Sequence, residues 1–269
     1  MPTSSTSDPA SPPARRVAVV TGSSRGLGRG IAVALASSGC DVVVNYAADE
    51  VAAKETATMV EGTGAAARVV AGDVRDPATA DRLVVAAEAL GGLDVWVNNA
   101  GVSVLAPVLD TEPADLVRMV DVNLLGTFHG LRAAATRMRA TATAGRIINV
   151  ASEVAVQAFP LLGAYAATKF AVVGLTQAAA LELAADGITV NAVGPGTAET
   201  DMVLAERRSE VAISGSAPDD VRAAYLDAIP ARRFCEPADA GALVAWLAGP
   251  GASYVTGQTF LVNGGSVLH

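Results

Sequence analysis

The sequence predicts an α/β fold in which helices cover both faces of a doubly wound parallel sheet of about seven strands. Three observations support this fold class. Short runs of β-branched residues alternate with longer alanine-rich segments from Val17 onward. These short runs are apolar throughout, which is typical of parallel strands that are buried on both faces. A glycine-rich turn also joins the first run to a helical segment, as in doubly wound folds.

The predicted strands are the apolar runs, at 17–21, 42–46, 68–71, 93–97, 146–150, 189–193 and 259–262. The predicted helices lie between them, near 27–38, 50–61, 77–90, 113–139, 164–185 and 237–248, and several begin with Asp, Thr or Pro at capping positions. Residues 198–230 break the alternation because they carry many charges, Gly215 and Pro218, and no strand pattern. A connection of this length is more often a lid than a plain loop. We therefore expect one domain over 15–269 with a mobile lid at about 198–230.

Composition excludes several classes of partner. The formal net charge of −8 and the pI near 4.8 argue against a surface that neutralises nucleic-acid phosphates. The mean hydropathy of +0.40 raises the question of a membrane span, and residues 240–269 carry no charge if His269 is neutral. Gly249, Pro250 and Gly251 interrupt that stretch, so no run of about 20 apolar residues remains. We expect neither a nucleic-acid nor a membrane partner.

The N-terminal residues 1–14 are rich in Ser, Thr and Pro and lack both a basic start and an apolar core. We expect a disordered tail rather than a secretory signal, and hence a cytoplasmic protein. Cys40 and Cys235 are too few for a disulfide framework, and neither has the neighbours of a metal site. The sequence therefore predicts no bound metal.

Tyr165 and Lys169 lie four residues apart in a run of helix-forming composition, and Ser152 lies 13 residues before the tyrosine. A helix would place the phenol and the ammonium on one face. A nearby cation favours phenolate, so we expect a lowered Tyr165 pKa that suits proton exchange with an alcohol or a carbonyl. Such a pair also occurs by chance in long helices. Lys54 is the only other lysine in a chain that otherwise uses arginine, which favours a functional role for Lys169.

The first predicted strand runs into a turn with the spacing Gly-x-x-x-Gly-x-Gly, at Gly22, Gly26 and Gly28. Glycines there let backbone amides approach a pyrophosphate, and the N-terminus of the following helix adds its positive end. The spacing differs from the common Gly-x-Gly-x-x-Gly fingerprint. Turns of this kind also occur for packing reasons alone.

These motifs resemble those of the short-chain dehydrogenase/reductase family, in its compact single-domain form with a Rossmann-type fold. The resemblance extends from Val17 to Gly265. It rests on six ordered motifs, which are the three glycines of the turn, Asp73-Val74, Asn98-Asn99-Ala100-Gly101, Asn123, the Ser152, Tyr165 and Lys169 set, and Pro195-Gly196 with Thr200. Six motifs in this order at compatible spacings are very unlikely to coincide by chance.

The resemblance implies that Asn123, Ser152, Tyr165 and Lys169 are catalytic. Tyr165 would exchange the proton, Lys169 would lower its pKa and reach the ribose, and Ser152 would bind the reacting oxygen. Asn123 would hold a water that links the lysine to solvent, although it could instead cap or bend a helix. The implied cofactor-binding residues are Gly22, Ser24, Arg25, Gly26, Leu27, Gly28, Asn45, Asp73, Val74, Asn99, Ala100, Gly101, Tyr165, Lys169, Pro195, Gly196 and Thr200.

The chain departs from the family pattern beside the catalytic serine and near the C-terminus. Glu153 follows Ser152, and Ala155 stands where many members have glycine. We expect Glu153 to point into solvent, with a place in the substrate pocket as the alternative. Asn263-Gly264-Gly265 replaces the usual Asp-Gly-Gly, which should affect a turn and not the chemistry.

NADP(H) is the favoured cofactor, and NAD(H) is possible. NAD specificity generally requires an acidic residue at the end of the second strand, but that strand ends Val44-Asn45-Tyr46-Ala47. Arg25 occupies a position where NADP-using relatives often keep a basic residue. Its guanidinium could pair with a 2′-phosphate, although the side chain could also simply be exposed.

The expected reaction is hydride transfer between the cofactor and a ketone or secondary alcohol. Segments 229–233 and 254–259 most resemble those of 3-oxoacyl-thioester (acyl-carrier-protein) reductases. Acetoin and polyol dehydrogenases share them, so an NAD(H)-dependent enzyme of that type is the alternative. Residues 159–162 suggest an apolar pocket wall. A non-catalytic dinucleotide sensor is a remote alternative, and a nucleotide-sugar epimerase would usually be longer. The resemblance also implies a homotetramer, formed through the helix that carries Tyr165 and through the last helix and strand.

Overall fold

The computed structural model describes residues 15–269, so the expected N-terminal tail at 1–14 lies outside the described residues. It contains one seven-stranded sheet in the order β3-β2-β1-β4-β5-β6-β7, and every pairing is parallel. The predicted fold class is therefore confirmed. The strands are β1 Arg16–Val20, β2 Cys40–Tyr46, β3 Ala67–Ala71, β4 Val95–Asn98, β5 Arg146–Val150, β6 Thr189–Pro195 and β7 Thr259–Val262.

Nine α-helices lie within residues 15–269, together with short 3₁₀ turns at 108–110, 153–155, 184–186 and 250–252. The helices are α1 Gly26–Ser37, α2 Glu50–Glu61, α3 Pro77–Glu88, α4 Pro113–Met119, α5 Gly126–Ala140, α6 Gly163–Leu183, α7 Asp201–Ser214, α8 Pro218–Asp227 and α9 Pro237–Ala248. The single helix expected at 113–139 is interrupted, because residues 120–125 form a π-helical turn between α4 and α5. None of the helices in this range is both long enough and apolar enough to cross a membrane.

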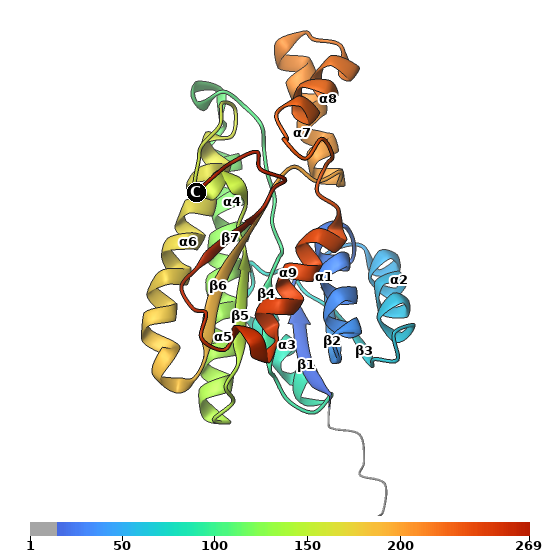
Figure 1. Cartoon of the computed structure of the whole chain (residues 1–269), viewed down its shortest axis with the longest axis vertical. Helices are drawn as coiled ribbons and strands as arrows, with labels where there is room; N and C mark the ends of the chain where they lie inside the picture. Colours follow the sequence, from blue (N-terminus) through green and yellow to red (C-terminus); the bar gives the residue numbers. More distant parts are fainter. Residues whose placement is uncertain (1–14) are drawn as a thin grey trace, which may run out of the picture.

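Helices cover both faces of the sheet (Figure 1), and an apolar core lies between the helices and each face. Alternate residues of β1 divide between the two cores, since Ala18 packs with α1, α2 and α9 while Val19 packs with α3, α5 and α6. The strands are thus buried on both sides, which explains their continuous apolar runs. The strand order reverses between β1 and β4. In doubly wound sheets the ligand crevice lies at this reversal, beyond the carboxyl ends of the strands.

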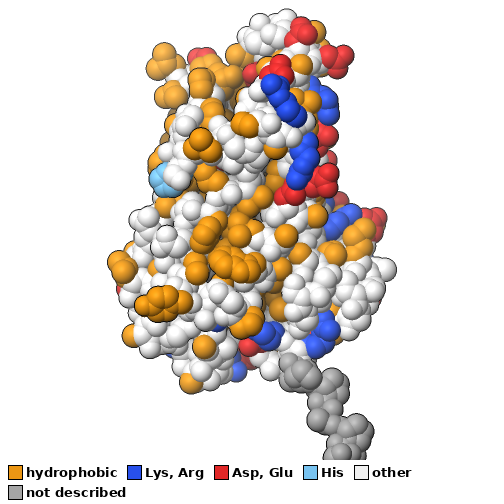
Figure 2. Space-filling view, in the orientation of Figure 1, with side chains coloured by type: hydrophobic (Ala, Val, Ile, Leu, Met, Phe, Trp, Pro, Cys, Tyr) orange, Lys and Arg blue, Asp and Glu red, His pale blue; other side chains and the backbone are white. Residues whose placement is uncertain are grey.

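Residues 198–230 contain two helices, α7 and α8, which lie together at the end of the molecule beyond the carboxyl ends of the strands (Figure 1). Acidic and basic side chains gather around this end (Figure 2). The segment has little of its own core, since only Arg207 in α7 and Val221 in α8 are buried. It is a helical pair placed over the crevice, and its mobility stays a prediction.

Candidate active site

The glycine turn between β1 and α1 packs directly against the segment that follows β4. Gly22 has a φ of +59°, and a Cβ there would lie 2.9 Å from Cα of Ala100. The Thr21 hydroxyl oxygen accepts hydrogen bonds from the backbone amides of Asn99 at 2.9 Å and Ala100 at 3.1 Å. Only glycine fits both this conformation and this distance. The two motifs are therefore one structural unit at the reversal of the strand order.

Two asparagines brace this unit with their side chains. Asn45 is buried, its Oδ1 accepts from the Gly22 amide at 3.0 Å, and its Nδ2 donates to the carbonyls of Val70 and Gly72. Asn99 donates through Nδ2 to the carbonyls of Thr21 and Gly22. The polar side-chain atoms of Asn45 are used within the protein, so this residue shapes the turn from behind.

The N-terminus of α1 has the character of an anion site. Within the described residues no side chain caps the helix, and its first turn contains no acidic residue. The backbone amides and the positive helix end therefore suit a pyrophosphate. Thr200 closes this site from the lid side, because a Cβ on Gly26 would lie 3.3 Å from its Cγ2. Arg25 is exposed at the same place and pairs with Asp201 of α7 at 3.2 Å. These residues fit a dinucleotide.

The other predicted cofactor residues lie at or just after the carboxyl ends of β1, β3 and β6. Ser24 and Leu27 are partly buried in the turn. The Asp73 carboxylate holds the Arg75 guanidinium at 2.7 and 2.9 Å, and this cation lowers the pKa of Asp73. Val74 packs against Gly126 at the start of α5. Pro195 ends β6, and the Gly196 amide donates a hydrogen bond to the Val262 carbonyl. A Cβ on Gly196 would lie 2.8 Å from Cα of Asn263.

Lys169 and Tyr165 lie together on α6, facing the carboxyl end of β5. The Lys169 side chain is only 3% exposed, and its Nζ donates to the Val150 carbonyl at 2.8 Å and lies 5.6 Å from the centre of the Tyr165 ring. Ser152 lies two residues after the end of β5, and its hydroxyl lowers the pKa of the Tyr165 phenol. The predicted Ser, Tyr and Lys set is thus brought together by one helix and one strand end.

Asn123 lies in the π-helical turn, an irregularity that often marks functional positions in helices. Its side chain is fully buried, with Oδ1 accepting from the Val102 amide at 2.8 Å and Nδ2 donating to Val102 O and to the Thr168 hydroxyl. Gly101 precedes Val102, and a Cβ placed on it would lie 3.4 Å from Asn123 Oδ1 and 3.6 Å from Lys169 Nζ. The Asn123 side chain therefore fixes the segment after β4 beside the lysine.

The expectation of a lowered Tyr165 pKa is wrong for the protein without ligands. Tyr165 as a whole is partly exposed. Its hydroxyl is buried, however, and this burial raises the pKa of the phenol. The Glu206 carboxyl raises it further, and the Ser152 hydroxyl lowers it by a smaller amount. Burial also lowers the pKa of Lys169 to about 8, so the lysine is only partly an ammonium ion in mildly alkaline solution.

Comparison with protein families matches residues 22–267 to the family described as enoyl-(acyl carrier protein) reductase. L-2,3-butanediol dehydrogenase of Corynebacterium glutamicum is 42% identical over 256 residues, which are 94% of this chain and 99% of that protein. A match of this extent decides the family. The chain is a short-chain dehydrogenase/reductase. It is accordingly an NAD(P)-dependent oxidoreductase that acts on a ketone or a secondary alcohol.

Other members of the short-chain dehydrogenase/reductase family differ in substrate at similar identity. The 3β-hydroxysteroid dehydrogenase 1 of Eggerthella lenta is 40% identical over 94% of both chains, and a diacetyl reductase of Staphylococcus epidermidis is 37% identical over 94% of this chain and 98% of its own. A solved short-chain alcohol dehydrogenase of Sinorhizobium meliloti superposes with a TM-score of 0.84 at 37% identity, covering 93% of this chain and 96% of its own. A 3-oxoacyl-[acyl-carrier-protein] reductase of Staphylococcus epidermidis is 36% identical to this chain. The expected resemblance to reductases of this class is therefore matched or exceeded by the resemblance to the butanediol and diacetyl enzymes.

Glu153 does not point into solvent, which corrects the expectation from the sequence. It is 8% exposed, and its carboxylate accepts a short hydrogen bond from the Ser266 hydroxyl near the C-terminus. Burial raises the pKa of Glu153, while Ser266 and Asn263 lower it in part. The Glu153 side chain thus ties the residue next to Ser152 to the C-terminal segment. The sequence around Glu153 could not indicate this hydrogen bond, because Ser266 lies 113 residues further along the chain.

Sequence reasoning missed two polar residues at the site, Ser103 and Glu206. Glu206 lies in the lid helix α7, close enough to Tyr165 to affect its pKa. Ser103 lies five residues after the end of β4. Neither belongs to a motif, and only the packing of α7 over the crevice brings them near the phenol.

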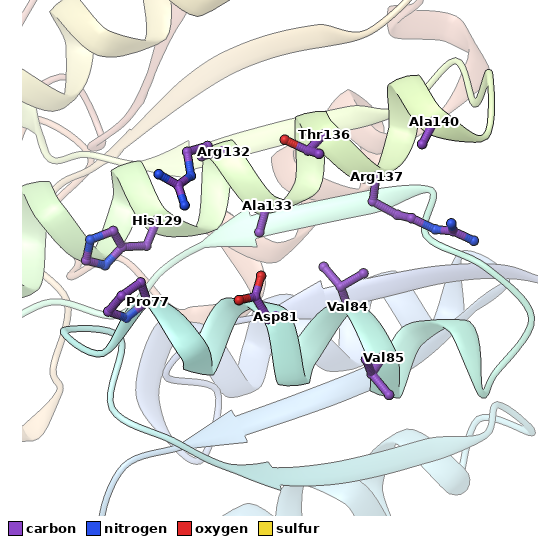
Figure 3. A pocket seen from close by; sticks show the side chains of 10 residues that line it. All are labelled: Pro77, Asp81, Val84, Val85, His129, Arg132, Ala133, Thr136, Arg137 and Ala140. Atoms are coloured by element: carbon purple, nitrogen blue, oxygen red, sulfur yellow. The ribbon is translucent and has the colours of Figure 1, made fainter.

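A separate hollow of about 390 Å³ lies between α3 and α5, away from these residues (Figure 3). Asp81, Val84 and Val85 line it from α3, and His129, Arg132 and Arg137 line it from α5. His129 Nδ1 lies 3.2 Å from the Val74 carbonyl oxygen and donates a hydrogen bond to it in the tautomer that carries the proton on Nδ1. None of the proposed catalytic residues borders this hollow.

Proposed function

We propose that the protein is an NADP(H)-dependent dehydrogenase of small ketones and secondary alcohols of the acetoin and polyol type. The observation that carries this proposal is the meeting of Ser152, Tyr165 and Lys169 beside the glycine turn at the strand reversal. The names of the butanediol and diacetyl relatives support small substrates with adjacent oxygens. Reduction of 3-oxoacyl thioesters is the second candidate, favoured by the relative at 36% identity.

In this proposal Tyr165 gives a proton to the carbonyl oxygen during reduction and takes it back during oxidation. Ser152 hydrogen-bonds the same oxygen and holds it against the phenol. A bound nicotinamide supplies or takes up the hydride. Lys169 stands behind the tyrosine, where its charged form favours phenolate. Asn123 keeps the 101–102 segment beside the lysine.

The preference for NADP(H) rests on Arg25 and on the end of β2. Asn45 and Tyr46 end that strand without a carboxylate. Arg25 is exposed, and its ion-pair partner among residues 15–269 is the similarly exposed Asp201. An exposed pair of this kind is weak, so a 2′-phosphate can replace it. Comparing kcat/KM for NADPH and NADH tests the preference. NADPH should be favoured, and Arg25→Ala should reduce that preference by at least roughly 10-fold. Equal or greater efficiency with NADH in the unaltered protein would overturn the proposal.

The substrate class is tested with a panel of ketones and the oxidised or reduced cofactor. We expect turnover of acetoin, diacetyl and 2,3-butanediol to exceed turnover of a short 3-oxoacyl thioester. The opposite order would favour the second candidate. No hydride transfer to any ketone of the panel would contradict the proposed function altogether.

We also propose a homotetramer. Large apolar side chains are exposed at Phe128 on α5, at Phe170 on α6 and at Trp246 on α9. Trp246 packs edge to face on Phe260 of β7. Figure 2 shows apolar side chains gathered over α9 and β7. Exposed patches of this kind favour self-association. Light scattering should give about four times the chain mass, and a mass near 27.0 kDa would exclude the tetramer.

A further inference from the structure

The backbone carbonyl of Ser24, in the middle of the glycine turn, accepts several hydrogen bonds from side chains. Arg29 donates to it through Nε at 3.2 Å and through Nη2 at 2.8 Å, and the Thr56 hydroxyl donates to it at 2.9 Å. The Thr56 hydroxyl oxygen also accepts a hydrogen bond from Arg29 Nε at 2.9 Å. The three residues thus form one hydrogen-bonded cluster, the Ser24 clamp.

The Ser24 clamp joins the first turn of α1 to the middle of α2. Thr56 is fully buried, and the Ala52 carbonyl lies 3.1 Å from both its hydroxyl and Arg29 Nη2. The same Nη2 donates to the Glu55 carboxylate at 3.0 Å. A planar guanidinium that is bound to four acceptors has a fixed orientation. The direction of the Ser24 carbonyl is therefore set by α2 and not by the turn alone.

This carbonyl direction determines where the amide of Arg25 points. A trans peptide unit is planar, so the Arg25 N–H is directed opposite to the Ser24 carbonyl and hence away from α2. The two preceding amides are already used, since Gly22 donates to Asn45 Oδ1 at 3.0 Å and Ser23 donates to the Asn45 carbonyl at 2.9 Å. Within residues 15–269 the Arg25 amide has no such acceptor. Arg25 is exposed, so its amide is available to an anion.

We propose that Arg29 and Thr56 are positioning residues for the cofactor, and that the Ser24 clamp directs Arg25 toward the 2′-phosphate of NADP(H). Neither residue touches the cofactor in this role. They hold the Ser24–Arg25 peptide, so that the Arg25 amide and guanidinium are both in place before the phosphate binds. The uncharged 2′-hydroxyl of NAD(H) gains less from these donors than a phosphate does. This inference rests on the proposed function, because it assumes that NADP(H) is the cofactor.

The test measures the Kd of NADPH and of NADH by nicotinamide fluorescence, without a ketone, so that no hydride transfer is needed. The quantity compared is the Kd for NADH divided by the Kd for NADPH. Thr56→Val replaces the hydroxyl by a methyl group and should lower this ratio about 3- to 10-fold, as for the loss of one hydrogen bond. Arg29→Lys keeps the charge but loses the planar fork, and should lower the ratio similarly. Thr56→Ser keeps the hydroxyl and should leave the ratio within about 2-fold of the unaltered protein.

Thr58→Val is the matched control, because Thr58 is exposed on the same helix and its hydroxyl bonds the Lys54 carbonyl at 3.1 Å. This variant should leave the ratio unchanged. A merely structural role of the clamp would lower the melting temperature and weaken both cofactors equally. A ratio within about 2-fold of the unaltered protein in Thr56→Val therefore overturns the proposal, and Arg29→Lys decides if Thr56→Val does not fold. If the unaltered protein itself binds NADH at least as tightly as NADPH, the proposed cofactor preference fails, which is a distinct outcome.

Discussion

Replacing Lys169 by methionine should make the protein more stable at neutral pH while it removes activity. The lysine is almost fully buried, and burial lowers its pKa from 10.5 to about 8. Below pH 8 both the folded and the unfolded chain carry the charge, so folding must desolvate an ammonium ion. The difference in pKa corresponds to about 3.4 kcal/mol. Losing the hydrogen bond to the Val150 carbonyl costs about 1 kcal/mol, which leaves a net gain of about 2 kcal/mol.

The stability advantage of Lys169→Met should decrease as the pH rises. As pH rises from 8 toward 10.5, the folded lysine is neutral while the unfolded one still binds a proton, so the penalty shrinks and then disappears. The advantage of Lys169→Met should therefore narrow by about 2 kcal/mol between pH 7 and pH 9.5. Urea unfolding of the cofactor-free protein, followed by fluorescence and checked for reversibility at each pH, measures the difference.

Lys54→Met is the matched control, because Lys54 is the only other lysine and its side chain is exposed beside Glu50. Its stability should stay within about 0.5 kcal/mol of the unaltered protein at both pH values. A Lys169→Met variant that is less stable at pH 7, or a gain that does not change with pH, would refute the reasoning from burial.

Two further predictions concern Glu153 and the lid. Burial raises the pKa of Glu153, so folding is penalised once the pH exceeds its unfolded value. The gain in stability of Glu153→Gln over the unaltered protein should therefore be larger at pH 7 than at pH 4. Thermal melts that show a gain of equal size at both pH values would argue against this. Arginine-directed proteolysis should cut after the exposed Arg208 or Arg222 quickly in the free protein and slowly with NADPH plus substrate, whereas equal rates would show that the lid does not respond to ligand.

The sheet could be predicted because the pattern that indicates each strand lies within the strand's own residues. A parallel strand buried on both faces must be apolar along its length, and residues such as Val42 to Val44 carry this signal without reference to the rest of the chain. The π-helical turn at Asn123 had no such signal. It depends on the contacts of the Asn123 side chain with Val102 and Thr168, which come from distant segments.

The grouping of the proposed catalytic residues was predictable because they follow fixed spacings, and a helix converts the spacing of Tyr165 and Lys169 into proximity. Their pKa values were not, because charge proximity and burial act in opposite directions and only the packed structure shows that burial is larger. Glu153 was wrongly expected to be exposed, and Glu206 was missed, for a related reason. A lone carboxylate is usually exposed, and its burial depends on partners far away in the chain.

The most direct test of the account is to follow the transfer of deuterium from the 4-position of labelled NADPH to acetoin. The unaltered protein should place the label on the carbon of the new alcohol. Tyr165→Phe should slow this transfer by at least roughly 10²-fold while NADPH still binds with nearly unchanged affinity, because only the proton donor is removed. Transfer by Tyr165→Phe at more than about a tenth of the normal rate, or no transfer by the unaltered protein to any ketone, would contradict the account.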